Sequence, residues 1–527
     1  MRRWYENPDR PMAPAMTTEA LPADPKGRPA AAGEVAFESK AGRWVLAVTV
    51  MGSGMVFLDG TVVNVALAHI GRDFKASTST LQWILNGYLL TLAALILLGG
   101  SLGDRYGRRR VFVSGVGLFT FASLLCAVAP SAGLLIAARL VQGVGGALLT
   151  PGSLSIIDAS FRPADRARAI GAWSGLGGVA TALGPLLGGY LVLDVSWRAI
   201  FVINLPIGLF VAFAATKHIP ESRDPRATGR LDIEGAVLAA LGLAGTTYAL
   251  IEGAGNGGSA PVLVCGIGGL VALAAFLVRE RQAENPMMPL QMFRSRQFSA
   301  ANLVTFVVYG ALGGVFFLLV SFLQIALGYS AVAAGASSLP ITLLMLLFSA
   351  RSGALAQRIG PRIPLTLGPI VIAAGLLLMT RINPGDSYVS SVLPAVVVFG
   401  LGLTLVVAPV TAVVLSAADS RNSGIASGIN NAVSRVAGLL AVAVLPLIAG
   451  LTGHKFFNPS DMTHGFHVAA LTCAGLAAFG GLLACVTISS EIGTDEPAVS
   501  DTPPSEAPRH FSCDIAGAPL AAPQPRD

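Results

Sequence analysis

The chain carries little charge for its length. Asp, Glu, Lys and Arg make up 12% of its 527 residues, about half of the roughly 25% found in average soluble proteins. Hydrophobic residues make up 53%. A soluble domain of this size would need more charged surface. The composition therefore excludes a soluble protein and predicts one that crosses a membrane many times.

Other absences exclude further classes of function. The five cysteines show no pairing or metal-binding pattern and are expected to be small apolar residues. The chain lacks the Gly-x-x-x-x-Gly-Lys-Ser/Thr loop of ATP-driven pumps and any catalytic or metal-binding constellation. We therefore expect neither an enzyme nor a bound cofactor or metal. The first forty residues are polar and rich in proline, so no cleavable signal peptide is expected.

Long apolar runs are what the chain has instead. A membrane-spanning helix needs about 20 mainly apolar residues, and continuous runs of this kind exclude a transmembrane barrel. We predict an all-α integral membrane protein with fourteen transmembrane helices. The runs cover residues 44–69, 80–102, 111–129, 132–157, 167–192, 199–216, 233–252, 261–278, 298–325, 332–351, 363–381, 388–417, 424–450 and 465–488.

The positive charges lie mainly on one side of these runs. Lys and Arg in short loops mark the cytoplasmic side, and the N-terminal tail and the loops on its side, such as 105–110, are rich in arginine. Both termini are therefore expected in the cytoplasm, and this requires an even number of spans. The excess of Arg over Lys indicates a bacterial source, so we expect the bacterial inner membrane. The net charge of +6 thus reflects topology, and no nucleic-acid partner is expected.

A repeated loop divides the chain into two halves. The sequence GSLGDRYGRR at 100–109 recurs as GALAQRIGPR at 353–362, each time after the second span of a half. Eight spans separate the copies rather than six, which predicts two helices inserted between two six-helix halves, an arrangement typical of transporters. The predicted parts are a cytoplasmic tail (1–42), the N-terminal half (43–218), two linker helices with their cytoplasmic loops (219–297), the C-terminal half (298–490) and a disordered cytoplasmic tail (491–527).

Asp59 is the only acidic residue in the first apolar run. An ionisable group at membrane depth is costly and marks a functional site by default. At 1.5 Å per residue, Asp59 lies about 15 Å and Arg139 of the fourth span about 12 Å from the same side of the membrane, so the two are predicted to pair. Pairing favours the charged carboxylate and burial favours the protonated one. This balance suits proton exchange, although a static pair that only orients helices stays open.

Three further motifs lie in the N-terminal half. In the loop 100–110, glycines permit a tight turn, and Asp104 lies where the dipole of the third span favours an anion. The fifth span contains Gly-Pro-Leu-Leu-Gly-Gly at 184–189, whose small residues allow close helix packing and whose proline bends the helix. The sixth span is preceded by Trp197-Arg198, an interfacial anchor, and includes Asn204, which we expect to be hydrogen-bonded inside the bundle.

These motifs, with LDGTVVNVAL at 58–67 and RLVQGVGGA at 139–147, resemble the major facilitator superfamily, specifically its fourteen-span drug:proton antiporters, over residues 44–488. The resemblance implies the major facilitator fold and a role for Arg139 in proton transfer. It also implies that residues 184–189 are the antiporter motif, typical of exporters, carried by Gly184, Pro185, Gly188 and Gly189. In the thirteenth span, Ser434-Arg435 stands where the family usually has Arg-Gln, which leaves the role of Arg435 open.

The resemblance further implies a charge network that latches the two halves on the cytoplasmic side. Asp158, at the cytoplasmic end of the fourth span, is the predicted partner of Arg105 or Arg109. In the second copy of the loop Gln357 replaces the acid, so a latch there is expected to be weaker. The predicted latch residues are Gly100, Asp104, Arg105, Gly107, Arg109 and Asp158.

The predicted function is export of amphipathic small molecules (drugs, dyes, or an antibiotic or other natural product) by alternating access. The proton gradient supplies the energy, and proton binding at Asp59 weakens its pairing with Arg139. The expected partners are a small-molecule substrate, protons and the lipid bilayer, and the expected state is a monomer. A proton-coupled importer of a metabolite and a non-transporting membrane sensor are the alternatives. The predicted substrate contacts are Asn64, Trp83, Asn86, Tyr88, Gln142, Phe306, Asn430 and Arg435.

Overall fold

The computed structural model describes residues 35–225, 227, 231–417 and 423–490. Within these ranges the chain forms helices and one isolated bridge, between Val35 and Phe161, but no strand. Fourteen of the described helical segments are long and apolar enough to cross a membrane, which confirms the predicted number. The helices mostly extend past the predicted runs because polar turns at their ends continue beyond the apolar stretch. The predicted tails, apart from residues 35–42, lie outside the described residues.

The first six spans are α1 to α7, with the sixth built from two pieces, and they make up the N-terminal half. They are α1 (Lys40–Asp73), α2 (Thr78–Tyr106), α3 (Arg108–Ala127), α4 (Ala132–Ser160), α5 (Pro163–Asp194), and α6 (Ala199–Val202) with α7 (Asn204–His218). The side chains of Ser39, Ser77 and Ser131 accept hydrogen bonds from backbone N–H groups of the first turns of α1, α2 and α4. Such caps satisfy donors that a helix leaves unpaired.

Two linker spans and six further spans complete the bundle. They are α8 (Ile233–Asn256), α9 (Ala260–Gln282), α10 (Arg296–Ile325), α11 (Ala331–Ala336) with α12 (Leu339–Ile359), α13 (Arg362–Met379), η2 (Tyr388–Val392) with α14 (Leu393–Ser416), α15 (Ser423–Ile448) and α16 (Pro459–Thr487). Short helices η1 (Leu290–Arg294) and η4 (Lys455–Phe457) precede α10 and α16.

Proline explains where three spans break. Pro206, Pro340 and Pro394 lie two or three residues after the breaks that precede α7, α12 and α14. Proline has no N–H to donate to the preceding turn, so it fits the first turn of a helix but not its interior. Each of the three helices therefore carries its proline in the first turn.

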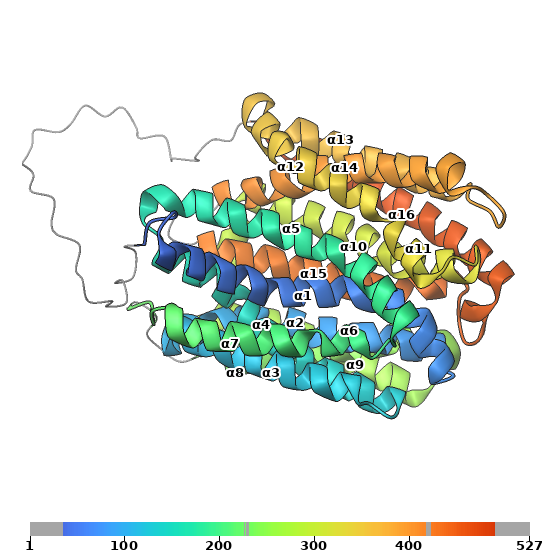
Figure 1. The fold of residues 1–527 in the computed structure, drawn as a ribbon, viewed down its shortest axis with the longest axis horizontal. Helices are drawn as coiled ribbons and strands as arrows, with labels where there is room; N and C mark the ends of the chain where they lie inside the picture. The colour runs from blue at the N-terminus through green and yellow to red at the C-terminus, as the bar shows by residue number, and fades with distance from the viewer. Residues whose placement is uncertain (1–34, 226, 228–230, 418–422, 491–527) are drawn as a thin grey trace, which may run out of the picture.

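In Figure 1, α2, α3, α4 and α7 of the N-terminal half lie at the bottom and α12, α13 and α14 of the C-terminal half at the top, with α1, α5, α10 and α15 drawn between them. The linker helix α8 packs on α9 and touches α2 and α15, one from each half. Much of α9 is exposed, including Val264, Ile267 and Leu270. This position suits a helix pair that covers the seam between the halves and faces lipid.

The repeated loop has the same backbone form in both halves. Gly107 joins α2 to α3 and has a φ of 116°, and Gly360 joins α12 to α13 and has a φ of 82°. Only glycine adopts such angles without strain. The sequence repeat is therefore also a structural repeat.

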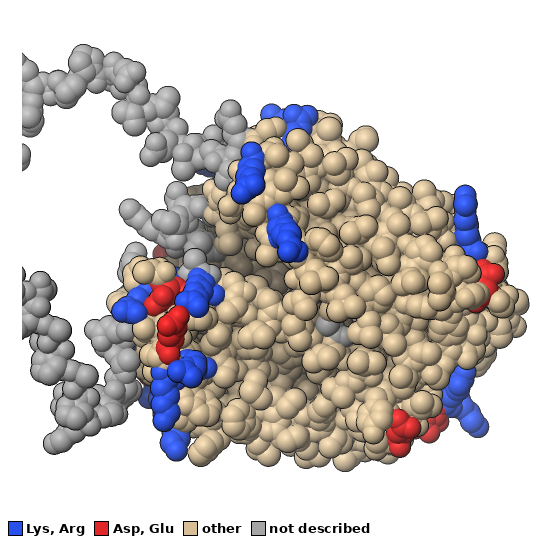
Figure 2. All heavy atoms as spheres, turned by 45° about the horizontal axis from the view of Figure 1, so that its top comes forward, with Lys and Arg blue, Asp and Glu red and all other residues tan. Residues whose placement is uncertain are grey.

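The halves meet closely at one end of the bundle. We call the end where α1 begins and α16 ends the termini end, and the other the far end. At the far end the Gln324 amide donates to the Val65 carbonyl (2.9 Å), and the Gln82 amide donates to the Val442 carbonyl (2.7 Å). Toward the termini end the surface is hollowed between two lobes (Figure 2). The structure is therefore closed at the far end and open toward the termini end.

Candidate functional site

The predicted pair of membrane-depth charges is present. The Arg139 Nη1 atom of α4 lies 2.5 Å from the Asp59 Oδ2 atom of α1, and the two side chains are 1% and 0% exposed. Helix spacing brings them together because α1 and α4 run in opposite directions and both residues lie in the portion nearer the far end. A buried pair of this kind is stable only when its remaining polar atoms are also satisfied.

A polar network satisfies them. The Gln142 amide donates to Asp59 Oδ1 (2.9 Å), and its oxygen accepts from Arg139 Nη1 (2.6 Å). The Ser123 hydroxyl oxygen of α3 accepts from Gln142 (2.9 Å) and from Asn204 of α7 (3.3 Å). The carboxylate thus accepts on both oxygens, and residues of α3, α4 and α7 form the network that holds it.

The rest of the guanidinium is also enclosed. Arg139 Nε donates to the Ile84 carbonyl of α2 (3.1 Å). Its Cζ atom lies 4.3 Å from the centre of the Tyr88 ring and 5.9 Å from that of Phe201. Contact with an aromatic face stabilises a desolvated cation. The network is therefore sealed from solvent on the described sides.

The Gly-Pro motif of α5 packs against both halves. A Cβ atom on Gly184 would overlap Thr61 of α1, and one on Gly188 would lie 2.5 Å from Val62. A Cβ on Gly189 would lie 2.6 Å from the Ala331 carbonyl of α11, in the C-terminal half. Because Thr61 is two residues after Asp59, the motif connects the buried pair to the contact between halves.

The arginine-rich loop makes its ion pairs near the termini end. Asp104, in the last turn of α2, pairs with Arg108 in the first turn of α3 (2.8 Å). Glu221, in the segment after α7, accepts from the Arg109 backbone (3.1 Å) and lies 3.7 Å and 3.6 Å from the Arg109 and Arg110 side chains. The loop is thus fastened to the segment that leads into the linker.

The predicted partnership of Asp158 with Arg109 is wrong. Asp158 pairs with Arg166 at the start of α5 (3.1 Å), while Arg109 is held by Glu221. The prediction failed because it used depth alone, and α4 presents Asp158 toward α5 rather than toward the loop. Arg105 lies with its guanidinium 5.8 Å from the Tyr106 ring. A latch that joins the two halves stays a prediction for a conformation closed at this end.

Several predicted substrate contacts lie elsewhere. Gln142 and Tyr88 belong to the buried network, because their helix faces turn toward Arg139 rather than toward a cavity. Trp83 donates to Glu252 of the linker helix α8 (3.3 Å) and lies near the ring of Tyr248. A substrate contact by any of these three residues stays a prediction.

Three other candidates also lie away from the described cavity. Asn86 is fully buried, and neither of its amide atoms has a hydrogen-bond partner in the described part of the chain. Asn64 is half-buried, and its amide donates weakly to the Gly60 carbonyl one turn earlier (3.5 Å). Phe306 is 38% exposed and does not line the cavity. Their contact with a substrate stays a prediction.

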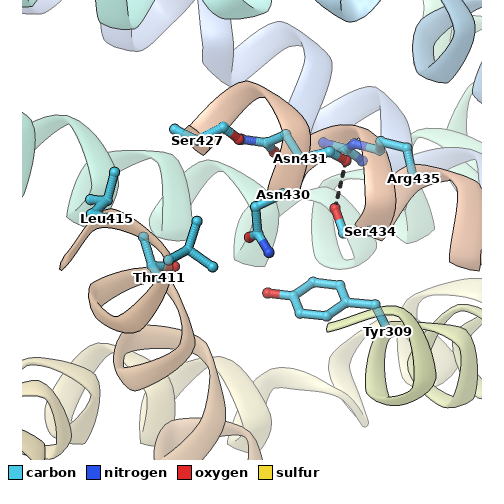
Figure 3. Close-up of a pocket in the computed structure, with 9 residues that line it drawn as sticks. Tyr309, Thr411, Leu415, Ser427, Asn430, Asn431, Ser434 and Arg435 are labelled. Atoms are coloured by element: carbon cyan, nitrogen blue, oxygen red, sulfur yellow. Dashed lines mark hydrogen bonds between the residues drawn. The ribbon is translucent and has the colours of Figure 1, made fainter. Parts of the chain in front are cut away.

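The remaining two candidates, Asn430 and Arg435, line a cavity of about 220 Å³ between α10, α14 and α15 (Figure 3). The Asn430 amide donates to Asn302 (3.2 Å) and Thr305 (2.9 Å) of α10. The hydroxyl of Tyr309 points into the same space (Figure 3). The cavity lies in the C-terminal half, apart from the Asp59 pair.

Some residues that position the site were not predicted from the sequence. Ser123 links Gln142 to Asn204, and Gln82 and Gln324 fasten the halves at the far end. All are uncharged polar residues within apolar runs, which was the signal available. Their partners are mostly backbone carbonyls or amides of other helices, so no pattern along the chain identifies them.

Comparison with known proteins agrees with this architecture. The family model of the Major Facilitator Superfamily matches residues 49–442 of this chain. The chain is 37% identical over 402 residues to the multidrug resistance protein Stp of Mycobacterium tuberculosis (strain CDC 1551 / Oshkosh), covering 76% of this chain and 74% of that protein. It is 37% identical over 419 residues to the tetracenomycin C resistance and export protein of Streptomyces glaucescens, covering 78% and 77%.

A solved structure shows the same fold. A bacterial homolog of the human lysosomal transporter Spinster, in an inward-facing and unoccupied conformation, matches with a TM-score of 0.61 and 17% identity, over 85% of this chain and 97% of that one. At this identity the likeness concerns the fold alone. Together with the family match and the relatives, it shows that this chain is a multi-pass membrane transporter of the Major Facilitator Superfamily, not an enzyme.

Proposed function

We propose that this transporter exports amphipathic small molecules across the bacterial inner membrane in exchange for protons, by alternating access. The observation that carries the proposal is the buried Asp59–Arg139 pair, whose side chains are almost completely excluded from solvent. No cofactor takes part, and the proton gradient supplies the energy. The names of the relatives, which include multidrug resistance and antibiotic export, support small organic molecules as substrates.

Asp59 is the proposed proton site. In the described conformation both of its oxygens accept hydrogen bonds, from Arg139 and Gln142, so this conformation corresponds to the charged carboxylate. Protonation removes the charge that compensates Arg139. An uncompensated buried guanidinium is strongly unfavourable, so the network has to rearrange before the halves return to this state.

The Gly-Pro motif is the proposed mechanical link. Thr61 of α1 donates to the Thr181 carbonyl of α5 (3.2 Å), and α5 packs on α11 of the C-terminal half through Gly189 and Gly335. A shift of α1 after protonation therefore reaches the contact between the halves through α5. Opening the far end and closing the termini end would then release the substrate.

The termini end is the proposed cytoplasmic end. The described loops at this end hold the Arg108–Arg110 cluster and the arginines at the start of α5, whereas the far end carries fewer basic residues, among them Arg198, Arg381 and Lys455. Lys and Arg in short loops accumulate on the cytoplasmic side. A cavity open toward this end admits substrate from the cytoplasm, which fits export.

Everted membrane vesicles with a pH-sensitive dye test the proposal. Candidate compounds added to energised vesicles should collapse part of the pH gradient when the wild-type chain is present, and Asp59→Asn should abolish this response. Asp194→Asn is a matched control because Asp194 is exposed at the far end of α5. If Asp59→Asn vesicles transport the compound and lose part of the pH gradient as wild-type vesicles do, the coupling site lies elsewhere.

A further inference from the structure

Arg435 is a charge at membrane depth. It lies about 18 Å from the start of α15 and about 20 Å from its end at 1.5 Å per residue, so it is close to the middle of the span. Among the described residues it makes no ion pair or hydrogen bond, and its Nε atom is buried without a partner. Charges inside membranes are normally paired or face a watery cavity that carries function.

The surroundings of Arg435 are polar but uncharged. The cavity wall contains hydroxyl and amide groups, and no acidic residue is among the described residues that line it. These polar residues are Tyr309, Thr411, Ser427, Asn430, Asn431 and Ser434. Figure 3 shows Tyr309 and Asn430 pointing into the cavity and Arg435 one turn along α15 from Asn431. The local charge is therefore positive, with hydrogen-bond donors around it.

The size of the cavity limits what it holds. Its volume of about 220 Å³ is below the roughly 300–1,000 Å³ typical of a site that encloses a drug-sized ligand. Thr411 and Leu415 are exposed on the wall nearer the termini end, so the cavity is not closed. It suits one polar end of a ligand whose apolar remainder lies outside it, in the hollow between the halves.

We propose that Arg435 binds a carboxylate, phenolate or sulfonate of the substrate, so that the preferred substrates are amphipathic anions. This inference rests on the proposed export function and specifies its substrate class. A guanidinium forms strong, paired hydrogen bonds with such groups, and the anion neutralises a charge that the chain itself leaves uncompensated. A cationic ligand would be repelled by Arg435 and would find no acidic side chain among the described residues of this wall.

Two dyes of the same xanthene scaffold and opposite charge test the proposal. Fluorescein is the anionic probe and rhodamine 123 the cationic one, and binding to the purified full-length chain in lipid nanodiscs is followed by fluorescence anisotropy. Wild type should bind fluorescein more tightly than rhodamine 123. Arg435→Gln should weaken fluorescein binding by roughly tenfold to a hundredfold, the effect of a charge-assisted hydrogen bond. Arg435→Lys should restore part of it, and Arg381→Gln, an exposed charge in the same half, should have no effect.

Either of two results would overturn the proposal. One is no fluorescein binding by the wild type, and the other is a dissociation constant of Arg435→Gln for fluorescein within twofold of the wild-type value. The assay needs no proton gradient, so it separates the two proposals. Fluorescein binding that depends on Arg435, in a chain that moves no protons, would leave the anion site standing and remove the proposed coupling.

Discussion

Arg139 and Arg435 both lie at membrane depth, one in each half, and their surroundings are opposite. Arg139 is 1% exposed, paired with Asp59, bonded to Gln142 and covered by Tyr88. Arg435 lines a cavity and has no partner among the described residues. An arginine at membrane depth is thus paired within the chain in one half and left without an ion-pair partner among the described residues in the other.

The difference separates two tasks. A charge that is fully compensated within the chain can respond to a proton but has nothing left for a ligand. A charge that is left uncompensated on a cavity wall can respond to a ligand. The N-terminal half is therefore suited to coupling and the C-terminal half to recognition.

The largest expected effect on stability comes from removing one member of the closed pair. Arg139→Ala leaves Asp59 buried without its partner and should cost about 3–5 kcal/mol, whereas Arg435→Ala leaves no group unpaired and should cost less than about 1 kcal/mol. Thermal unfolding of the purified proteins measures both. The double variant Asp59→Asn/Arg139→Gln should be more stable than Arg139→Ala, because no buried charge remains. Equal losses for Arg139→Ala and Arg435→Ala would remove the contrast between the two sites.

The next effect is on the link between the pair and the C-terminal half. Gly184→Ala places a Cβ atom where Thr61 lies, and overpacking of this kind typically costs about 1–3 kcal/mol. Export should fall more than ligand binding, because the cavity around Arg435 is untouched. Gly178→Ala is the control, since a Cβ there meets open space. The packing explanation fails if both variants export equally well.

A smaller effect is expected from the hydroxyl that supports the network. Ser123→Ala removes the acceptor shared by Gln142 and Asn204 and should cost about 1–3 kcal/mol. Ser434→Ala removes a hydroxyl that, among the described residues, donates to the Asn431 carbonyl of its own helix and to no other group. It should leave the unfolding temperature nearly unchanged. A larger loss for Ser434→Ala than for Ser123→Ala would contradict the assignment of the closed network to the N-terminal half.

The smallest effect concerns Asp158. It pairs with Arg166, and both side chains are exposed. Exposed ion pairs contribute about 0–1 kcal/mol to the free energy of unfolding. Asp158→Asn should therefore leave unfolding and export close to wild type. Glu221→Gln should reduce stability more, because Glu221 holds both the backbone and the side chain of Arg109. An export defect in Asp158→Asn alone would restore its role in a latch.

Sequence predicted the features that depend on position along a helix. The number of spans, the repeat marked by Gly107 and Gly360, and the depth of Asp59 and Arg139 all follow from spacing and composition. Sequence could not predict which side of each helix faces which neighbour. Spacing did not show that Tyr88 and Gln142 contact Arg139, or that Asp158 pairs with Arg166 and Arg109 with Glu221.

Partners contributed by loops and backbone carbonyls could not be predicted from the sequence either. Glu221 lies more than a hundred residues from Arg109, and Gln324 bonds a carbonyl of α1. Such contacts depend on how the spans are arranged in space, and a single sequence does not show this arrangement directly.

The most direct test of proton coupling compares two kinds of movement in the same vesicles. One is exchange of labelled substrate for unlabelled substrate without a gradient, and the other is accumulation driven by a proton gradient. If Asp59 carries the proton and Arg435 the substrate, Asp59→Asn should keep exchange and lose accumulation, while Arg435→Gln should lose both for an anionic substrate. Gradient-driven accumulation by Asp59→Asn at the wild-type level would contradict the assignment of Asp59 as the coupling site.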